Sequence, residues 1–119
     1  EARVNECIFC KIVRGDIPAA FALQDSEFVA FPDINPKAPV HLLVMPRAHV
    51  RSLNEVAAQD AGFGQRLLAF VASAAASVGV GQNGYRVIIN NGKAGGQVIW
   101  HLHVHVLGGR PDMGPMLSA

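Results

Sequence analysis

Histidine and aliphatic residues alternate from His101 to Leu107, and this run constrains the fold more than any other segment. Side chains alternate between the two faces of a β-strand, so the run predicts a strand over 98–107. His101, His103 and His105 would then share one face, with neighbours about 6.5–7 Å apart. Three of the five histidines in the chain would therefore line one side of one strand.

The remaining segments predict four more strands, one short helix and one long helix. A helix over 7–14 is expected to end at Gly15. Apolar residues with a 3.6-residue period predict a long amphipathic helix over 60–78, with Asp60 at or near its N-cap. The other strands are expected over 21–23, 28–31, 40–45 and 85–90. Because the connections are short, we expect a mainly antiparallel five-stranded sheet and the α+β class.

Length and composition limit the class of protein. The chain has 119 residues, which predicts a single domain over 1–119. Apolar residues make up 50% of the chain and charged residues 16%, which excludes a disordered chain. The net charge is +1 and no long basic run is present, so a nucleic-acid surface is not expected.

The sequence also bears on location. The stretch 67–85 carries no formal charge, but glycines and polar residues in its second half predict a turn rather than a membrane span. Residues 1–6 lack the apolar core of a signal peptide. We therefore expect a soluble cytoplasmic protein that does not bind membranes.

Three interpretations of the histidine face are open. It can be an ordinary solvated face, although such faces usually carry Thr, Lys and Glu. It can hold a metal ion, but side chains two and four apart on a twisted strand diverge, so convergence needs a bulge. It can perform phosphate or acid–base chemistry, since a neutral imidazole nitrogen can attack phosphorus. The glycine-rich loop at 90–97 favours this third interpretation, because loop N–H groups bind anions.

The run 101–107 resembles the His-x-His-x-His signature of the histidine triad family, and the whole chain looks like the Hint-like branch. Supporting segments are 7–12, 31–34, 38–46, His49, 83–86, 95–97 and 108–110. The resemblance covers a motif-bearing core at 7–110 and leaves an irregular tail at 111–119. It implies a homodimer whose two sheets join into one, and a hydrolase of purine nucleoside 5′-phosphoramidates such as adenosine 5′-monophosphoramidate.

The resemblance also implies a mechanism that needs no metal. His103 would attack the α-phosphorus to form a nucleotidyl-histidine, and water would then release the nucleoside monophosphate. His105 would contact the phosphate and the leaving amine. His41 would sit behind His103 and fix its tautomer, and His101 completes the catalytic set.

Substrate contacts are implied for a further group of residues around the histidines. The residues expected to wall the purine are Ile8, Phe9, Phe31, Ile34 and Leu43. Asp33 is expected to bind the ribose hydroxyls. The residues expected at the phosphate are Asn90, Gly96, Gln97 and Val98. The apolar members can equally be plain core. Asp33 can be only a turn residue, and His41 can be a buried core histidine.

Cys7 and Cys10 form a single C-x-x-C motif, which is compatible with zinc, redox chemistry or chance. Some histidine triad proteins combine such cysteines with two histidines, which here are His49 and His101. The resemblance therefore implies a structural zinc site with two cysteine and two histidine ligands. The alternative is two buried free thiols.

The chain departs from the family pattern at several positions. Val98 stands where many relatives have Ser or Thr, which can donate a hydrogen bond to the bridging atom. Pro32 replaces a histidine of animal relatives, and the tail lacks a Trp-Pro-Pro ending. Two alternative functions stay open within the family, a dinucleoside polyphosphate hydrolase and a nucleotidyl transferase. Outside enzymes, a nucleotide-binding interaction protein with little turnover is the alternative, as is metal binding by the three histidines.

Overall fold

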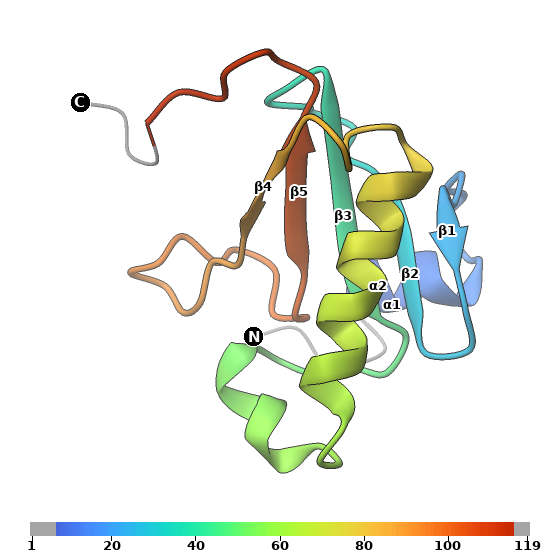
Figure 1. Cartoon of the computed structure of the whole chain (residues 1–119). Helices are drawn as coiled ribbons and strands as arrows, with labels where there is room; N and C mark the ends of the chain where they lie inside the picture. The colour runs from blue at the N-terminus through green and yellow to red at the C-terminus, as the bar shows by residue number, and fades with distance from the viewer. Residues whose placement is uncertain (1–6, 116–119) are drawn as a thin grey trace.

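Five antiparallel strands form one sheet in the order β1-β2-β3-β5-β4 (Figure 1). The structure, a computed structural model, describes residues 7–115; residues 1–6, expected not to be a signal peptide, and the end of the tail at 116–119 lie outside it. The strands are β1 (Leu23–Gln24), β2 (Phe28–Pro32), β3 (Val40–Pro46), β4 (Tyr85–Ile88) and β5 (Val104–Gly108). With the helices α1 (Ile8–Arg14) and α2 (Phe63–Ser77), this arrangement confirms the predicted α+β class.

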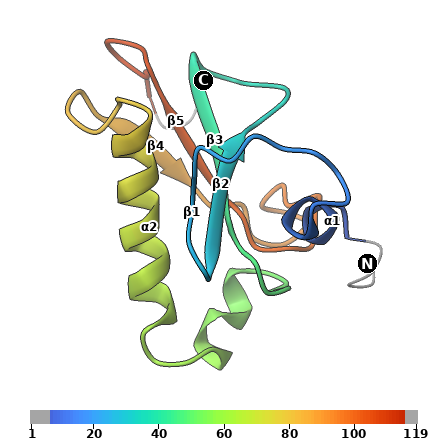
Figure 2. The ribbon, with the colours of Figure 1, turned by 90° about the vertical axis from the view of Figure 1, so that its right-hand side faces the viewer.

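The two helices lie on opposite faces of the sheet (Figure 2). Alternation along β2 shows why both faces are buried: Phe28 packs in the core cluster that contains α2, whereas Val29 and Phe31 pack in the cluster that contains α1. Leu43 of β3 belongs to the α1 cluster and is the direct partner of His105 on β5. Because directly opposite residues share a face, His105 lies on the α1 side of the sheet.

Helix α2 packs one face into the larger core cluster. It buries Phe63, Leu67, Phe70 and Val71 against the sheet, and each such side chain contributes about 1.5–3 kcal/mol when fully buried. The helix begins at Phe63 rather than at the predicted Asp60. The residues between them form a turn in which the Asp60 carboxylate accepts the Gly62 N–H at 3.3 Å.

A short 3-10 helix, η2 (Leu53–Ala58), precedes α2 and was not among the predicted elements. Ser52 is its N-cap: the hydroxyl accepts the Asn54 N–H at 3.2 Å and donates to the Glu55 carboxylate at 2.6 Å. This Ser-x-x-Glu spacing is the sequence signature of a capped helix start.

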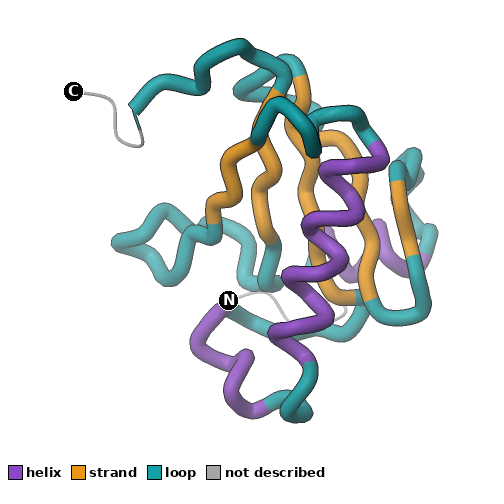
Figure 3. Tube along the Cα trace, viewed as in Figure 1, coloured by secondary structure: helices purple, strands orange, loops and turns teal. Residues whose placement is uncertain are grey.

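The largest difference from the predicted elements concerns the histidine run. Strand β5 begins at Val104, and residues 98–103 run as a loop (Figure 3). The Leu102 N–H donates to the Val50 carbonyl at 2.6 Å, outside the sheet ladder. The prediction that all three histidines share one strand face is therefore wrong, because His101 and His103 precede the strand.

Four other strands also differ from their predicted bounds at one or both ends. The strand predicted over 21–23 is Leu23–Gln24, and the strand predicted over 85–90 ends at Ile88. Strands β2 and β3 each extend one residue further than predicted, to Pro32 and Pro46. Within residues 7–115 the structure contains no helix with the length and apolar character that a bilayer crossing requires.

Candidate active site

Three histidines from β3, β5 and the loop before β5 meet on the α1 side of the sheet. The ring centroids of His103 and His105 lie 5.2 Å apart, as do those of His41 and His105. Asp33, in the turn after β2, places a carboxylate oxygen 3.5 Å from Nε2 of His41. The sheet therefore gathers three imidazoles and one carboxylate that are far apart in the sequence.

Hydrogen bonding assigns the tautomer of His103. Its Nδ1 lies 2.8 Å from the carbonyl oxygen of His101, and a carbonyl only accepts, so Nδ1 carries the hydrogen. In the neutral ring Nε2 then holds a lone pair. Burial lowers the pKa of His103 against the opposing effects of that hydrogen bond and of Asp33. The ring is therefore neutral near pH 7 and has a free nucleophilic nitrogen.

The tautomers of His41 and His105 follow from a chain of hydrogen bonds. The Lys37 backbone N–H donates to Nδ1 of His41 at 3.0 Å, so the hydrogen of His41 is on Nε2. That N–H faces Nδ1 of His105 at 2.9 Å. Since Nδ1 of His105 accepts, its Nε2 carries a hydrogen and is a donor.

This chain corrects the role expected for His41. The side chain was expected behind His103, but its hydrogen-bond partner is His105. The tautomer of His103 is set instead by the backbone carbonyl of His101. The physical reason is the register, which places His41 opposite Leu107 and diagonal to His105 on the same face.

The rings of His41 and His105 are both uncharged at neutral pH. Burial, followed by the neighbouring His103 and His41, lowers the pKa of His105 to about 4. Burial also lowers the pKa of His41. The site therefore offers one lone pair, on His103, and one N–H donor, on His105, without carrying a cationic imidazole.

The buried side chain of Gln97 stabilises the glycine-rich loop at 90–97 through hydrogen bonds to backbone groups. The side chain is only 4% exposed; its amide nitrogen donates to the carbonyls of Arg51 and Ile99 at 3.0 Å each. Its amide oxygen accepts the Gly92 N–H. Both amide hydrogens are thus used, and the structure does not support the expected contact of this side chain with phosphate.

Other expected phosphate contacts are placed differently. The Gly96 N–H donates to the Lys93 carbonyl at 3.1 Å, so this group is also occupied within the loop. Asn90 is partly buried, and Val98 is 82% exposed beside the histidine run. These two side chains are accessible to a ligand.

An aromatic group borders His103 on the α1 side. The Phe9 ring meets the His103 ring edge-on at 5.0 Å, and Phe31 meets Phe9 at 6.2 Å. Phe21, which the sequence did not single out, lies 6.1 Å from Phe31. Leu43 is buried in the same cluster.

Two further residues expected at the purine are exposed. Ile8 is 47% exposed and Ile34 is 92% exposed. Side chains this accessible are open to a ligand, but they add little to the core. Asp33 accepts the Asn35 N–H at 2.9 Å, which confirms its turn role and leaves its second oxygen beside His41.

A second group of side chains lies behind the first. Cys7, the N-cap of α1, and Cys10 within α1 meet His49 and His101, and the donor atoms of all four lie within 4.8 Å of one another. The sulfur–nitrogen distances are 3.4 Å from Cys7 to His101, 3.5 Å from Cys10 to His101 and 3.2 Å from Cys10 to His49. We call these four residues the Cys/His cluster.

The Cys/His cluster fits a tetrahedral metal ion. Zinc bonds of about 2.3 Å to sulfur and about 2.0 Å to nitrogen imply sulfur–nitrogen separations near 3.5 Å, which the observed distances match. His101 donates from Nε2 to the Pro46 carbonyl at 2.8 Å, which leaves its Nδ1 lone pair facing both sulfurs. Burial and the adjacent Cys7 raise the pKa of Cys10 to about 11, and only a cation would make a buried thiolate pair favourable.

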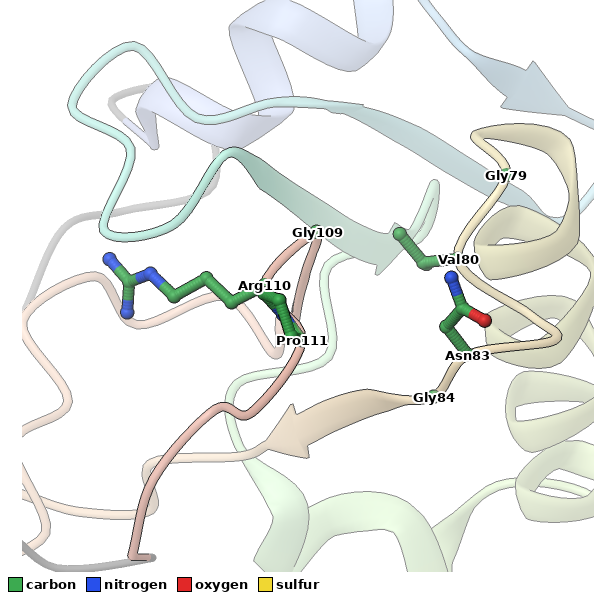
Figure 4. Close-up of a pocket in the computed structure, with 7 residues that line it drawn as sticks. All are labelled: Gly79, Val80, Asn83, Gly84, Gly109, Arg110 and Pro111. Carbon is green, nitrogen blue, oxygen red and sulfur yellow. The ribbon is translucent and has the colours of Figure 1, made fainter.

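A separate cavity among the described residues lies away from both histidine groups. It measures about 460 Å³ and lies between the turn after α2 and the segment after β5 (Figure 4). The lining residues are Gly79, Val80, Asn83, Gly84, Gly109, Arg110 and Pro111. None of them is a histidine, a cysteine or a carboxylate, so the chemistry places the candidate site at the histidines rather than at this cavity.

The site depends on three backbone groups that the sequence did not reveal. The His101 carbonyl sets the tautomer of His103. The Lys37 N–H sets the tautomer of His41, and the Pro46 carbonyl sets that of His101. Backbone groups are identical in every residue, so no sequence signal could have found them.

Comparisons with known proteins agree with this geometry. Residues 14–112 match the family model of the HIT domain. The chain is 42% identical over 114 residues to the purine nucleoside phosphoramidase of Escherichia coli K12, covering 96% of this chain and 95% of the relative. The structure is similar to a HIT family hydrolase from Clostridium thermocellum (TM-score 0.89, 37% identity, 98% and 100% of the two chains covered).

A second solved structure, a histidine triad protein from Clostridium difficile, gives a TM-score of 0.86 at 37% identity, with 99% of this chain and 100% of that chain covered. The relatives match nearly the whole chain, and they do so over the segments that build the histidine site and the sheet. The chain therefore belongs to the HIT, or histidine triad, family.

Proposed function

We propose that this protein hydrolyses purine nucleoside 5′-phosphoramidates, with His103 as the nucleophile. The observation that carries the proposal is the pairing of a bare Nε2 on His103 with an N–H donor on His105, whose ring centroids lie 5.2 Å apart. The 42% identity to an enzyme named purine nucleoside phosphoramidase supports the same substrate class.

In the first step, Nε2 of His103 attacks the α-phosphorus and a P–N bond to the enzyme forms. The bond to the leaving amine breaks, and the amine keeps the electron pair and takes a proton from solvent. The His101 carbonyl stabilises the positive charge that develops on the His103 ring, because it accepts the Nδ1–H. His105 donates from Nε2 to the phosphoryl group as charge develops there.

In the second step, water attacks phosphorus and the bond to His103 breaks. The electron pair returns to Nε2, and the attacking water releases a proton to solvent, which balances the proton taken up earlier. The products are the nucleoside monophosphate and the free amine. The residues that act are His103 and His105, with His41 and the His101 carbonyl holding their tautomers.

Nucleotide recognition is assigned to the residues around this pair. Phe9 and Phe31, edge-on to each other beside His103, form an apolar wall for the purine. The second oxygen of the Asp33 carboxylate, 3.5 Å from Nε2 of His41, can accept from a ribose hydroxyl. Asn90 and the exposed Val98 border the phosphate, and Val98 brings no hydroxyl for the leaving group.

We further propose that the Cys/His cluster holds a structural zinc ion. Cys7, Cys10, His49 and His101 would be its four ligands, and such a closed set leaves no position for substrate. When bound, zinc supplies a crosslink between the start of α1, the end of β3 and the loop before β5. It would contribute to folding and would not itself touch the reacting phosphorus.

The assembly proposed is a homodimer of single-domain chains in the cytoplasm. Among the described strands, β4 and β1 lie at the edges of the sheet, and β1 has only two residues. Strand β4 is therefore the edge better suited to join two sheets into one.

The test is hydrolysis of an adenosine 5′-phosphoramidate that carries a fluorogenic amine, without added metal. Turnover that releases adenosine monophosphate supports the proposal. Faster cleavage of a dinucleoside polyphosphate would favour that related hydrolase instead. Adenosine monophosphate binding without turnover of either substrate would favour a nucleotide-binding interaction protein, which is the function that the missing hydroxyl at Val98 suits.

A further inference from the structure

His101 joins the Cys/His cluster to the nucleophile. Its ring nitrogen Nδ1 faces the sulfurs of Cys7 and Cys10 at 3.4 and 3.5 Å. Its backbone carbonyl, in the same residue, accepts the Nδ1–H of His103 at 2.8 Å. The placement of the carbonyl that selects the His103 tautomer therefore depends on the placement of the His101 ring.

The segment around His101 is held from several sides. The ring is completely buried, and its second nitrogen donates to the Pro46 carbonyl at the end of β3. The next residue, Leu102, donates its N–H to the Val50 carbonyl. Because residues 98–103 lie outside the sheet, no strand ladder fixes them. These two contacts, together with those of the His101 ring with Cys7 and Cys10, take the place of a ladder.

Helix α1 adds a second connection. Phe9 lies between the two cysteines in the sequence, and its ring is edge-on to both His101, at 6.0 Å, and His103, at 5.0 Å. The helix is anchored at its first turn, where the Cys7 sulfur accepts the Cys10 N–H at 3.3 Å. Loss of the Cys/His cluster would thus free both the helix that packs on the nucleophile and the carbonyl that orients it.

We propose that the Cys/His cluster is a positioning element for His103, acting through His101, so that turnover depends on the cluster being intact. The inference rests on the proposed function of His103 as nucleophile. A displacement of the His101 carbonyl by an ångström breaks a 2.8 Å hydrogen bond and releases the His103 ring to rotate or to change tautomer. Misplacement of a reacting group on this scale costs up to about a hundredfold in rate.

A cluster that only stabilises the fold makes a different prediction. In that case its loss lowers the melting temperature, but the folded fraction keeps its rate constant. The two roles separate when kcat, nucleotide affinity and melting temperature are measured on the same variants.

The experiment uses His49→Ala and Cys10→Ser, which remove one ligand each and touch neither the His103 ring nor its carbonyl partner. Val71→Ala is the matched control, because it opens a cavity in the α2 core, away from the cluster. His49→Cys restores a metal-ligating side chain and serves as the rescue variant. Metal content, melting temperature, kcat and KM with the fluorogenic phosphoramidate, and the Kd of adenosine monophosphate are measured for each protein at a temperature where it is folded.

The expected result is a loss of at least about tenfold in kcat for both ligand variants, with the adenosine monophosphate Kd changed less than about threefold. Their metal content falls, and His49→Cys regains part of both metal and kcat. Val71→Ala lowers the melting temperature without changing kcat. If either ligand variant fails to fold, wild-type protein treated with a chelator takes its place.

A ligand variant that loses its metal and keeps kcat within about twofold overturns the proposal, as does an equal loss of kcat in Val71→Ala. If wild-type protein turns over no phosphoramidate, the proposed function fails. NMR of the histidine ring nitrogens then tests whether the Cys/His cluster positions His103. The claim expects His103 as the Nδ1–H tautomer in the wild type and a mixture of tautomers in His49→Ala. An unchanged His103 signal in that variant overturns the positioning claim alone.

Discussion

Replacement of His41 by alanine tests the hydrogen-bond chain that prepares His105. His41 takes the Lys37 N–H on Nδ1 and gives its own N–H to Nδ1 of His105 at 2.9 Å. Without that donor, His105 can move its hydrogen to Nδ1 and then presents a lone pair, instead of an N–H, to the anionic phosphoryl group. Under the proposed mechanism, the perturbation therefore removes one donor from the transition state while leaving His103 and His105 in the chain.

The magnitude follows from the bond that is lost. A hydrogen bond to a charged partner contributes about 1.5–3 kcal/mol, which corresponds to a loss of about 10- to 150-fold in kcat. His41 is only 6% exposed, so its removal also leaves the Lys37 N–H without its partner. That defect costs about 1–3 kcal/mol of folding stability, and water entering the space reduces it towards the lower value.

The assay is steady-state hydrolysis of the fluorogenic phosphoramidate by wild type, His41→Ala and His41→Gln. The glutamine amide can still donate to His105, so His41→Gln should keep a larger part of kcat than His41→Ala. Binding of adenosine monophosphate and the melting temperature show whether each variant is folded. The reasoning is refuted if His41→Ala keeps kcat within about twofold of wild type, or if His41→Gln loses as much as His41→Ala.

Four further predictions follow from the same geometry. His103→Ala should lose at least about a thousandfold in turnover while still binding adenosine monophosphate, measured by calorimetry. Metal analysis of purified protein should find about one zinc per chain; stable, zinc-free protein would contradict the four-ligand site. The melting temperature should fall as the pH drops from 6.5 towards 4. The pKa of His105 is about 4 in the folded chain and 6.5 in the unfolded chain, so the unfolded chain binds more protons in this range. The variant His105→Asn should weaken this pH dependence. Val98→Ser adds a donor at an 82% exposed position and should raise kcat about 2- to 10-fold without changing stability.

The helices and strands were predictable where one physical rule decides them. The 3.6-residue apolar period placed α2 to within a few residues, because that face packs on the sheet. Gly15 ends α1 as predicted, with a left-handed φ of 88° that favours glycine. The antiparallel sheet followed from short connections, which suit neighbouring strands.

The histidine run shows where such rules fail. A period of two predicted one strand face, but the tertiary contacts of His101 with the Cys/His cluster and of Leu102 with Val50 hold the first half of the run out of the sheet. Periodicity describes the local preference of the backbone, and these contacts come from residues about 50 and 90 positions earlier in the chain. Only the resemblance to the family brought the two cysteines and His49 together with His101 before the structure did.

The hydrogen bonds that the candidate site residues make could not be predicted from the sequence. His41 was expected in the site and is there, but it pairs with His105 and not with His103. Gln97 was expected at the phosphate, whereas its amide is consumed inside the loop. Each of these differences is caused by a hydrogen bond to a backbone group or by the strand register. Neither cause can be recognised from the residue types in the sequence.

The nucleophile is the central claim, and covalent trapping tests it most directly. Wild-type protein is mixed with a slowly cleaved purine nucleoside phosphoramidate, denatured at alkaline pH during turnover, digested and examined by mass spectrometry. The predicted result is a nucleoside monophosphate bonded to the peptide at His103, absent from His103→Ala, which should show no turnover. A nucleotide on His105, or full turnover by His103→Ala, would contradict the account.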